Sequence, residues 1–442
     1  MNGPVSLRLR KANQDIEVDQ FKLMRVFMLC FRIASICFFS VCAFITAFGA
    51  GPSADMSFTS APSLRDSLPS DNYIQLYGRL NNFFFRIEKE AEVSVAFLGG
   101  SITAGSGWRD RVMQYLESTY PRIKWKFLNA GIPSLGSLPH AFRFQSDVLA
   151  KGDVDLLFIE SAVNDLANGT PVQYQRRALE GIVRHARNAK PDIDIVLMAF
   201  ADEMKVADYA AGKIPIEVQV HQEIAKHYSL PFINLSEEVF RRIEAKEFTW
   251  KDDFIDLHPS PFGHQLYFRT IRRMFEMSSS RRPAARVRVV KMPEPIDPAN
   301  YSRGKYVSVE EAKIKNGFRI DPSWKPSDKA STRKGFVEVP MLVSSEPGST
   351  LELSFEGDAV GIAIVSGPDA GMIRYTVDGG KAESKDLFTQ WSKSLHLPWY
   401  LMLRDGLGPG KHTLTVTLLE EANPQSAGSA CRVVHLLVNQ PE

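Results

Sequence analysis

The stretch V-S-V-A-F-L-G-G-S-I-T, residues 93–103, predicts how the rest of the chain is arranged. Its first part is rich in β-branched and aromatic residues, which is typical of a buried strand, and the two glycines and a serine that follow indicate a turn into a helix. Gly99 and Gly100 have no Cβ, so the backbone can turn tightly and another molecule can approach closely. Ser101 is therefore our candidate nucleophile. Taken alone, Gly-Gly-Ser after a strand is more often a plain turn with a helix cap than a catalytic motif.

From Val93 onward, short apolar runs alternate with stretches of helical periodicity. The expected strands are residues 93–98, 124–128, 156–160, 193–200 and 231–234, and the expected helices are 108–118, 141–149, 171–188 and 216–227, with a further helix within 73–90. This alternation predicts a parallel sheet covered by helices on both faces. Ligands of such sheets bind outside the carboxyl ends of the strands, where Ser101 and the segments 129–137 and 161–165 fall. We also expect the helix that starts near Gly107 to direct its N–H groups toward Ser101.

The pattern changes after residue 277. Residues 278–300 are rich in Pro and Arg and indicate a linker, and residues 301–442 contain short alternating runs separated by Gly, Pro and Asp. Asp378-Gly379 is placed as the turn of a tight hairpin. We therefore expect an antiparallel, jelly-roll-like β-sandwich in this part of the chain, which is a suitable scaffold for carbohydrate binding. The catalytic domain is expected over residues 73–277.

The N-terminus indicates export. Basic residues precede an apolar run at residues 33–49, and Ala47 and Gly49 have the spacing of a signal-peptidase site. Residues 1–50 are thus expected to be a signal peptide or, alternatively, an uncleaved membrane anchor at residues 26–48. In either case the protein works outside the cytoplasm, in the periplasm or the extracellular space. Residues 51–72, rich in Ser, Pro and Ala, are expected to be a flexible tether.

Composition excludes several classes of function. The 442 residues include 53 basic and 51 acidic side chains, and this net charge of +2 gives no reason to expect nucleic acid as a partner. Three of the four cysteines, Cys30, Cys37 and Cys42, lie within the N-terminal residues 26–48, so no disulfide is expected in the rest of the chain. No Cys/His spacing indicates a metal, and Gly-Gly-Ser-Ile-Thr lacks the lysine of a phosphate-binding loop. We expect neither a metal nor another cofactor, and the oligomeric state stays open.

A serine hydroxyl needs a base before it can attack a carbonyl group. Among nine histidines, His258 stands out because it lies in D-D-F-I-D-L-H-P-S-P-F-G-H, a proline-bounded loop just before the last helix of the α/β region. The proline and the loop are suited to holding the imidazole toward the edge of the sheet. A histidine that only caps that helix is the alternative.

These residues together resemble the SGNH (GDSL-type) hydrolases over about residues 93–275. F-L-G-G-S-I-T resembles the first block of that family, L-N-A-G-I-P-S-L-G-S the second, E-S-A-V-N-D the third and D-L-H-P-S-P-F-G-H the last, in the family's order. The resemblance implies a flavodoxin-like three-layer domain that hydrolyses esters through Ser101 and His258. In the first block Gly100 replaces the commoner Asp, and this glycine is a candidate substrate contact.

The resemblance also implies an oxyanion hole formed by the backbone N–H of Ser101, a backbone N–H at Ser134 and the side-chain amide of Asn164. Ser134 stands where the family usually has glycine, while Gly131 and Gly136 lie on either side of it.

The acid that supports the histidine departs from the family pattern as well, because Ile255 occupies the position three before His258. Asp256 is our first choice for this acid, because residues two apart point the same way in an extended loop, and Asp253 is the second. A backbone carbonyl that orients His258 in place of an acid is the alternative.

We therefore expect an exported serine esterase that removes small acyl groups, O-acetyl in particular, from a carbohydrate or polysaccharide. An acylated carbohydrate or a small ester is the expected partner, with possible attachment to a membrane through the N-terminal segment. A polysaccharide O-acyltransferase and an inactive glycan-binding protein are the alternatives. Trp391 and Trp399 are candidate sugar-stacking residues of the sandwich.

Overall fold

Five parallel strands form the centre of the α/β domain. They are β2 (Glu92–Gly99), β3 (Lys124–Gly131), β4 (Leu156–Glu160), β5 (Asp194–Ala199) and β6 (Pro231–Asn234). Their order in the sheet is β3-β2-β4-β5-β6, and β1 (Ile74–Leu76) is added antiparallel to β6 at the edge. The five parallel strands thus follow the doubly wound, flavodoxin-like order, which confirms the predicted fold class.

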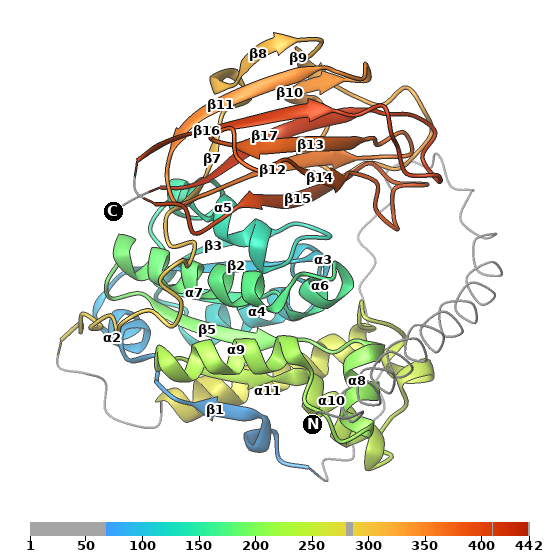
Figure 1. Cartoon of the computed structure of the whole chain (residues 1–442). Coiled ribbons are helices and arrows are strands. Elements are labelled where there is room, and N and C mark those ends of the chain that lie inside the picture. Colours follow the sequence, from blue (N-terminus) through green and yellow to red (C-terminus); the bar gives the residue numbers. More distant parts are fainter. Residues whose placement is uncertain (1–67, 280–285, 409, 441–442) are drawn as a thin grey trace, which may run out of the picture. The chain divides into compact units, whose positions relative to one another are not determined.

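Helices cover both faces of this sheet (Figure 1). One face packs against α5 (Ser137–Asp147), α7 (Val172–Ala189) and α9 (Ile216–His227). The other face packs against α2 (Asn81–Lys89), α4 (Trp108–Thr119), α10 (Leu235–Glu244) and α11 (Pro261–Ser279). Three short helices lie at the carboxyl ends of strands: α3 (Ser101–Ala104), α6 (Ala162–Ala167) and α8 (Glu203–Ala210).

The computed structural model describes residues 68–279, 286–408 and 410–440. The expected signal peptide or anchor, and most of the expected tether, lie outside these residues. None of the helices within the described ranges combines the length and the apolar character that a membrane span needs.

The expected helix within 73–90 is partly wrong. Residues 74–76 are the edge strand β1, and only residues 81–89 are helical. Between them, a Cβ at Gly78 would lie 1.8 Å from the carbonyl oxygen of Ser229. The chain can pass this neighbour so closely only with a glycine, and the close passage separates the strand from the helix.

The C-terminal domain is a sandwich of two antiparallel sheets, as expected (Figure 1). One sheet has the order β15-β12-β17-β10-β9, with β7 paired to β17, and the other has the order β14-β13-β16-β11-β8. The strands are β7 (Gly304–Val307), β8 (Lys313–Asn316), β9 (Arg319–Trp324), β10 (Val339–Ser344), β11 (Thr350–Glu356), β12 (Ala359–Ser366), β13 (Met372–Val377), β14 (Glu383–Asp386), β15 (Leu397–Arg404), β16 (Lys411–Leu418) and β17 (Cys431–Asn439). Asp378 and Gly379 both have positive φ in the hairpin between β13 and β14, as a type I′ turn requires.

The first of these sheets has two apolar faces. One face packs against the second sheet. Side chains of the other face, among them Tyr400 and Leu437, belong to the same buried cluster as Phe142 of α5. The ion pair between Arg177 of α7 and Asp405, which follows β15, lies beside this contact. The two domains therefore share a continuous core.

The segment that joins the domains follows the surface of α7. The buried carboxylate of Glu180 accepts hydrogen bonds from the backbone N–H groups of Ile296 and Asp297. The N–H of Tyr301 donates to the carbonyl of Arg177. These contacts fix residues 296–301 against the α/β domain.

Candidate active site

Three consecutive loops meet at the carboxyl ends of β2, β3 and β4. Gly99 at the end of β2 is the register partner of Gly131 at the end of β3, so their loops begin at the same level of the sheet. Ser101 begins α3 immediately after β2, and Asn164 lies in α6 after β4. This is the edge at which parallel sheets bind ligands.

The structure brings Ser101 and His258 together. Their Oγ and Nε2 atoms lie 2.8 Å apart, which is a hydrogen-bond distance. His258 comes from the loop that ends where α11 begins at Pro261, 157 residues further along the chain. This pair has the geometry that a serine nucleophile and its base require.

Asp256 is the carboxylate that lies beside His258. Its Oδ1 is 3.7 Å from Nδ1 of His258 and accepts a hydrogen bond from the His258 backbone N–H. The distance of 3.7 Å is too long for a hydrogen bond to the ring, and both side chains are more than half exposed, at 60% and 58%. Asp253 is directed elsewhere, since its carboxylate accepts from the N–H and hydroxyl of Thr249.

Our choice between these acids assumed an extended loop, and this assumption is wrong. Ile255 has φ 84° and ψ −69°, the values of a rare and strained γ-turn. This reversal occurs at the position where the family usually has its Asp. The Ile255 side chain is 55% exposed, and the reversal is followed by Asp256 beside the imidazole.

Three N–H donors at this edge have no acceptor among the described residues: the backbone N–H of Ser101, the backbone N–H of Ser134 and the side-chain amide of Asn164. A Cβ on Gly100 would lie 1.9 Å from Asn164 Nδ2 and 3.4 Å from the carbonyl oxygen of Leu135. The amide of Asn164 and the loop after β3 are therefore both next to the residue that precedes Ser101. Preformed donors of this kind can stabilise a developing oxyanion.

Gly131 and Gly136 serve close packing around these donors. A Cβ on Gly131 would lie 2.4 Å from the backbone nitrogen of Ala104 in α3. A Cβ on Gly136 would lie 2.4 Å from Oδ1 of Asp165 in α6. Each glycine thus lets the loop after β3 approach a helix that carries one of the site residues.

The motifs did not point to several residues that hold this site. Asp165 accepts hydrogen bonds from the N–H and hydroxyl of Ser137, and Asn168 donates its side-chain amide to the carbonyl of Ser134. Burial raises the pKa of Asp165 to about 7, against the lowering effect of the Ser137 hydrogen bonds. Asp165 directly follows Asn164, and this adjacency was its only sequence signal.

His264 is a second residue that sequence reasoning left out. Its Nδ1 accepts a hydrogen bond from the backbone N–H of Trp108 at 3.2 Å. Burial, with a contribution from Arg111, lowers the pKa of His264 to about 4, so the ring is neutral and can accept this bond. We had expected the N–H groups at the start of α4 to point toward Ser101. The first of them instead donates to His264.

The two candidate sugar-stacking tryptophans differ in exposure. Trp391 is 46% exposed, whereas Trp399 is partly buried and packs against the core between the two sheets of the sandwich. Beside Trp391, the side chain of Gln390 donates to the carbonyl of Ala167, the last residue of α6, at 3.2 Å. The loop of Trp391 therefore touches the helix that carries Asn164.

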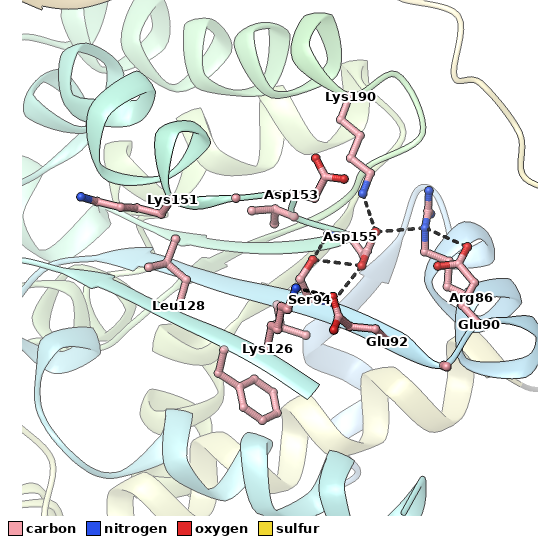
Figure 2. A pocket seen from close by; sticks show the side chains of 15 residues that line it. Arg86, Glu90, Glu92, Ser94, Lys126, Leu128, Lys151, Asp153, Asp155 and Lys190 are labelled. Atoms are coloured by element: carbon pink, nitrogen blue, oxygen red, sulfur yellow. Dashed lines mark hydrogen bonds and ion pairs between the residues drawn. The ribbon is translucent and has the colours of Figure 1, made fainter. Parts of the chain in front are cut away.

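A cavity of about 820 Å³ lies at the opposite end of the sheet, near the start of β2, β3 and β4. Figure 2 shows the charged side chains that line it. Arg86 and Lys190 both pair with Asp155, and Lys126 pairs with Glu92. Most of these charges neutralise one another, and none of the candidate catalytic side chains lines the cavity, so the candidate active site remains the edge of the sheet at Ser101. Over the described ranges, no group of three or more His, Cys, Asp or Glu side chains is arranged to hold a metal ion.

Comparisons with known proteins address the family and the fold. Residues 97–266 match the GDSL-like Lipase/Acylhydrolase family. The fold is similar to that of a two-domain esterase active on acetylated mannans, crystallised with mannopentaose, at 22% identity and a TM-score of 0.69 over 84% of this chain and 98% of that one. A second crystal structure of a two-domain esterase active on acetylated mannans gives the same identity and TM-score, with 99% of that chain covered.

An acetylxylan esterase from Geobacillus stearothermophilus, in the form of a catalytic mutant, matches with a TM-score of 0.37 and 21% identity over 41% of this chain and 94% of that one. Comparison with curated proteins gave no match. The matched region contains Ser101, Asn164 and His258 in one α/β domain. The α/β domain is therefore an ester hydrolase domain of the SGNH (GDSL-type) kind, and an additional C-terminal β-sandwich domain follows it.

Proposed function

We propose that this protein removes small acyl groups, O-acetyl in particular, from a carbohydrate through an acyl-enzyme on Ser101. The observation that carries the proposal is the 2.8 Å separation of Ser101 Oγ and His258 Nε2 next to three free N–H donors. Such a constellation is suited to acyl transfer to water.

In the first half of the reaction, Ser101 Oγ attacks the ester carbonyl carbon and its proton passes to His258 Nε2. The oxyanion that forms accepts hydrogen bonds from Ser101 N–H, Ser134 N–H and the Asn164 amide. Collapse of this intermediate breaks the bond between the acyl carbon and the sugar oxygen, which takes the proton from His258 and leaves. Asp256 stabilises the imidazolium after a small rotation toward Nδ1, since catalytic hydrogen bonds are often long without substrate.

In the second half, His258 takes a proton from a water molecule, whose oxygen attacks the acyl carbon. The Ser101 oxygen leaves, recovers its proton from His258, and a carboxylic acid is released. No redox step or additional reactant is needed.

Two observations support a carbohydrate as the substrate. The similarity to the acetylmannan esterase extends over 84% of this chain and so includes the sandwich as well as the α/β domain. The exposed Trp391 lies on a loop in contact with α6, and aromatic faces of this kind stack on sugar rings. We therefore assign Trp391 to the sugar and assign Trp399 to packing against the core of the sandwich.

The reaction is tested with an aryl acetate and an acetylated manno-oligosaccharide. Ser101→Ala is expected to abolish release of acetate from both substrates, while circular dichroism shows an unchanged fold. Turnover that is unaffected by Ser101→Ala would disprove the assignment. The comparisons give no support to an acyltransferase or to an inactive binding protein, and an acetate yield that is unchanged by added oligosaccharide acceptors would speak against transfer.

We also propose that the protein is exported, on the basis of the basic and apolar N-terminal sequence. Fractionation of cells that express the full chain tests this proposal, and N-terminal sequencing of the mature protein distinguishes cleavage from anchoring. Recovery in the cytoplasm alone would contradict it.

A further inference from the structure

The loop after β3 contains a tight turn formed by Ile132, Pro133, Ser134 and Leu135. The N–H of Leu135 donates to the carbonyl of Ile132 at 3.4 Å, and Ser134 has φ 72°. Proline at the second position and positive φ at the third are the marks of a type II turn. The third position of such a turn normally holds glycine, because a side chain there is strained.

The type of this turn determines where the N–H of Ser134 points. That N–H belongs to the central peptide of the turn, between Pro133 and Ser134, and the central peptide is reversed between type II and type I turns. Residues with a Cβ favour the negative φ of type I, and positive φ costs them roughly 1–2 kcal/mol. Ser134 therefore stays in the type II form only because its surroundings hold it there.

Helix α6 and its C-cap residue Asn168 supply hydrogen bonds to the carbonyl of Ser134 and to the loop that follows it. The side-chain amide of Asn168 donates to the carbonyl of Ser134 at 2.9 Å, and the carboxylate of Asp165 accepts from the N–H of Ser137 at 2.8 Å. Asn168 also donates its backbone N–H to the carbonyl of Asn164 at 2.9 Å. Asn168 thus connects the carbonyl that follows the Ser134 Cα, and so the C-terminal half of the turn, to Asn164, the residue that carries the third donor.

We propose that Asn168 is a positioning residue of the oxyanion hole. It holds the Ser134 turn in the orientation that presents its N–H to the substrate, and so replaces the conformational freedom that a glycine would provide at residue 134. The proposal rests on the function proposed above. It assigns no contact between Asn168 and the substrate.

The test compares Asn168→Ala, Ser134→Gly and the double variant with an aryl acetate. Asn168→Ala is expected to lower kcat about tenfold with little change in KM, because the loss falls on stabilisation of the transition state. In the Ser134→Gly background the same substitution should lower kcat by no more than about threefold, because glycine keeps the turn in its type II form without support.

A matched control is Asn316→Ala. The amide of Asn316 makes the same kind of bond, to the carbonyl of Gly348 at 3.1 Å, but in the sandwich. This variant should leave kcat unchanged. Urea unfolding of each variant corrects kcat for the folded fraction, so a general loss of stability is not mistaken for the proposed effect.

The outcomes distinguish the two proposals. A wild-type kcat retained in Asn168→Ala, or an equal loss in both backgrounds, overturns the role of Asn168 and leaves the esterase intact. Absence of any Ser101-dependent turnover in the wild type overturns the proposed function and this inference together.

Discussion

The Cα of Gly100 leaves no room for a side chain beside the amide of Asn164, because a Cβ there would lie 1.9 Å from Nδ2. Aspartate at residue 100, the commoner residue of the family, is incompatible with this arrangement. The glycine at residue 100, which departs from the family motif, is therefore what allows the Asn164 amide to occupy its present position.

Gly100→Ala tests this relationship. The added methyl group must displace the Asn164 amide, and loss of one such donor typically lowers kcat by about 100-fold or more. We expect a loss of that size in kcat toward an aryl acetate, with KM changed little. Gly408→Ala is the control, since nothing lies within 4 Å of the Cβ that it adds. Equal kcat in the two variants would contradict the role of Gly100.

The acid at residue 256 is tested by paired substitutions. Asp256→Ala should lower kcat by about ten- to 100-fold, because the imidazolium loses its nearest carboxylate. Asp253→Ala should have a much smaller effect on kcat, since that side chain is bonded to Thr249. Steady-state kinetics of both variants decides between the two acids, and a larger loss in Asp253→Ala would reverse the assignment.

Trp391 is expected to affect only the carbohydrate substrate. Trp391→Ala should raise KM for an acetylated manno-oligosaccharide about tenfold, because the stacking surface is lost. Hydrolysis of an aryl acetate, which has no sugar ring to stack on Trp391, serves as the internal control and should not change. Parallel losses on both substrates would indicate that the loop supports the fold and does not bind sugar.

The stability of the α/β domain depends on Asp155. Its carboxylate accepts from the N–H and hydroxyl of Ser94 and pairs with Arg86 and Lys190. Burial would raise the pKa of Asp155, but the hydrogen bonds from Lys190 and Ser94 outweigh it and lower the pKa. The stabilisation is therefore present above the unfolded pKa of about 4 and is lost as pH falls through the lower folded pKa.

Asp155→Asn should accordingly reduce the free energy of unfolding by about 3 kcal/mol at pH 7, measured with urea. Asp153→Asn is the control, since Asp153 is an exposed carboxylate that lines the same cavity. If the two variants are equally stable, the ion pairs of Asp155 contribute nothing.

Asp194 has the opposite dependence on pH. Burial raises its pKa to about 7, although it accepts a hydrogen bond from the N–H of Phe83. Its contribution to stability is full below the unfolded pKa of about 4 and is lost as pH rises through about 7. The free energy of unfolding, measured with urea, should fall less between pH 5 and pH 8 in Asp194→Asn than in the wild type. An identical loss in both would mean that Asp194 does not titrate in this range.

The sequence predicted the α/β pattern well because strand and helix periodicities were strong there. The ranges 156–160, 216–227 and 231–234 agree with β4, α9 and β6. Ser101 and His258 were found because each lies in a short motif with a chemical reason for its residue types. Their contact depends on parallel strands that present their ends at one edge, which the alternation of elements predicts.

Other features depend on contacts between distant segments and leave no local pattern. The strand β1 exists because residues 74–76 pair with β6, and its own sequence continues an apparently helical run. Likewise, the reversal at Ile255 could not be predicted, because β-branched residues rarely adopt positive φ. The assumption of an extended loop was therefore wrong. Asn168 could be recognised only after the turn at Ser134 was seen.

The common core of α5 and the first sandwich sheet has a consequence for synthesis of the protein. The α/β part of the chain is made first, and the apolar surface of Phe142 stays uncovered until β15 and β17, near the end of the sequence, have been translated. A nascent chain therefore carries an incompletely covered α/β half until its last strands are added.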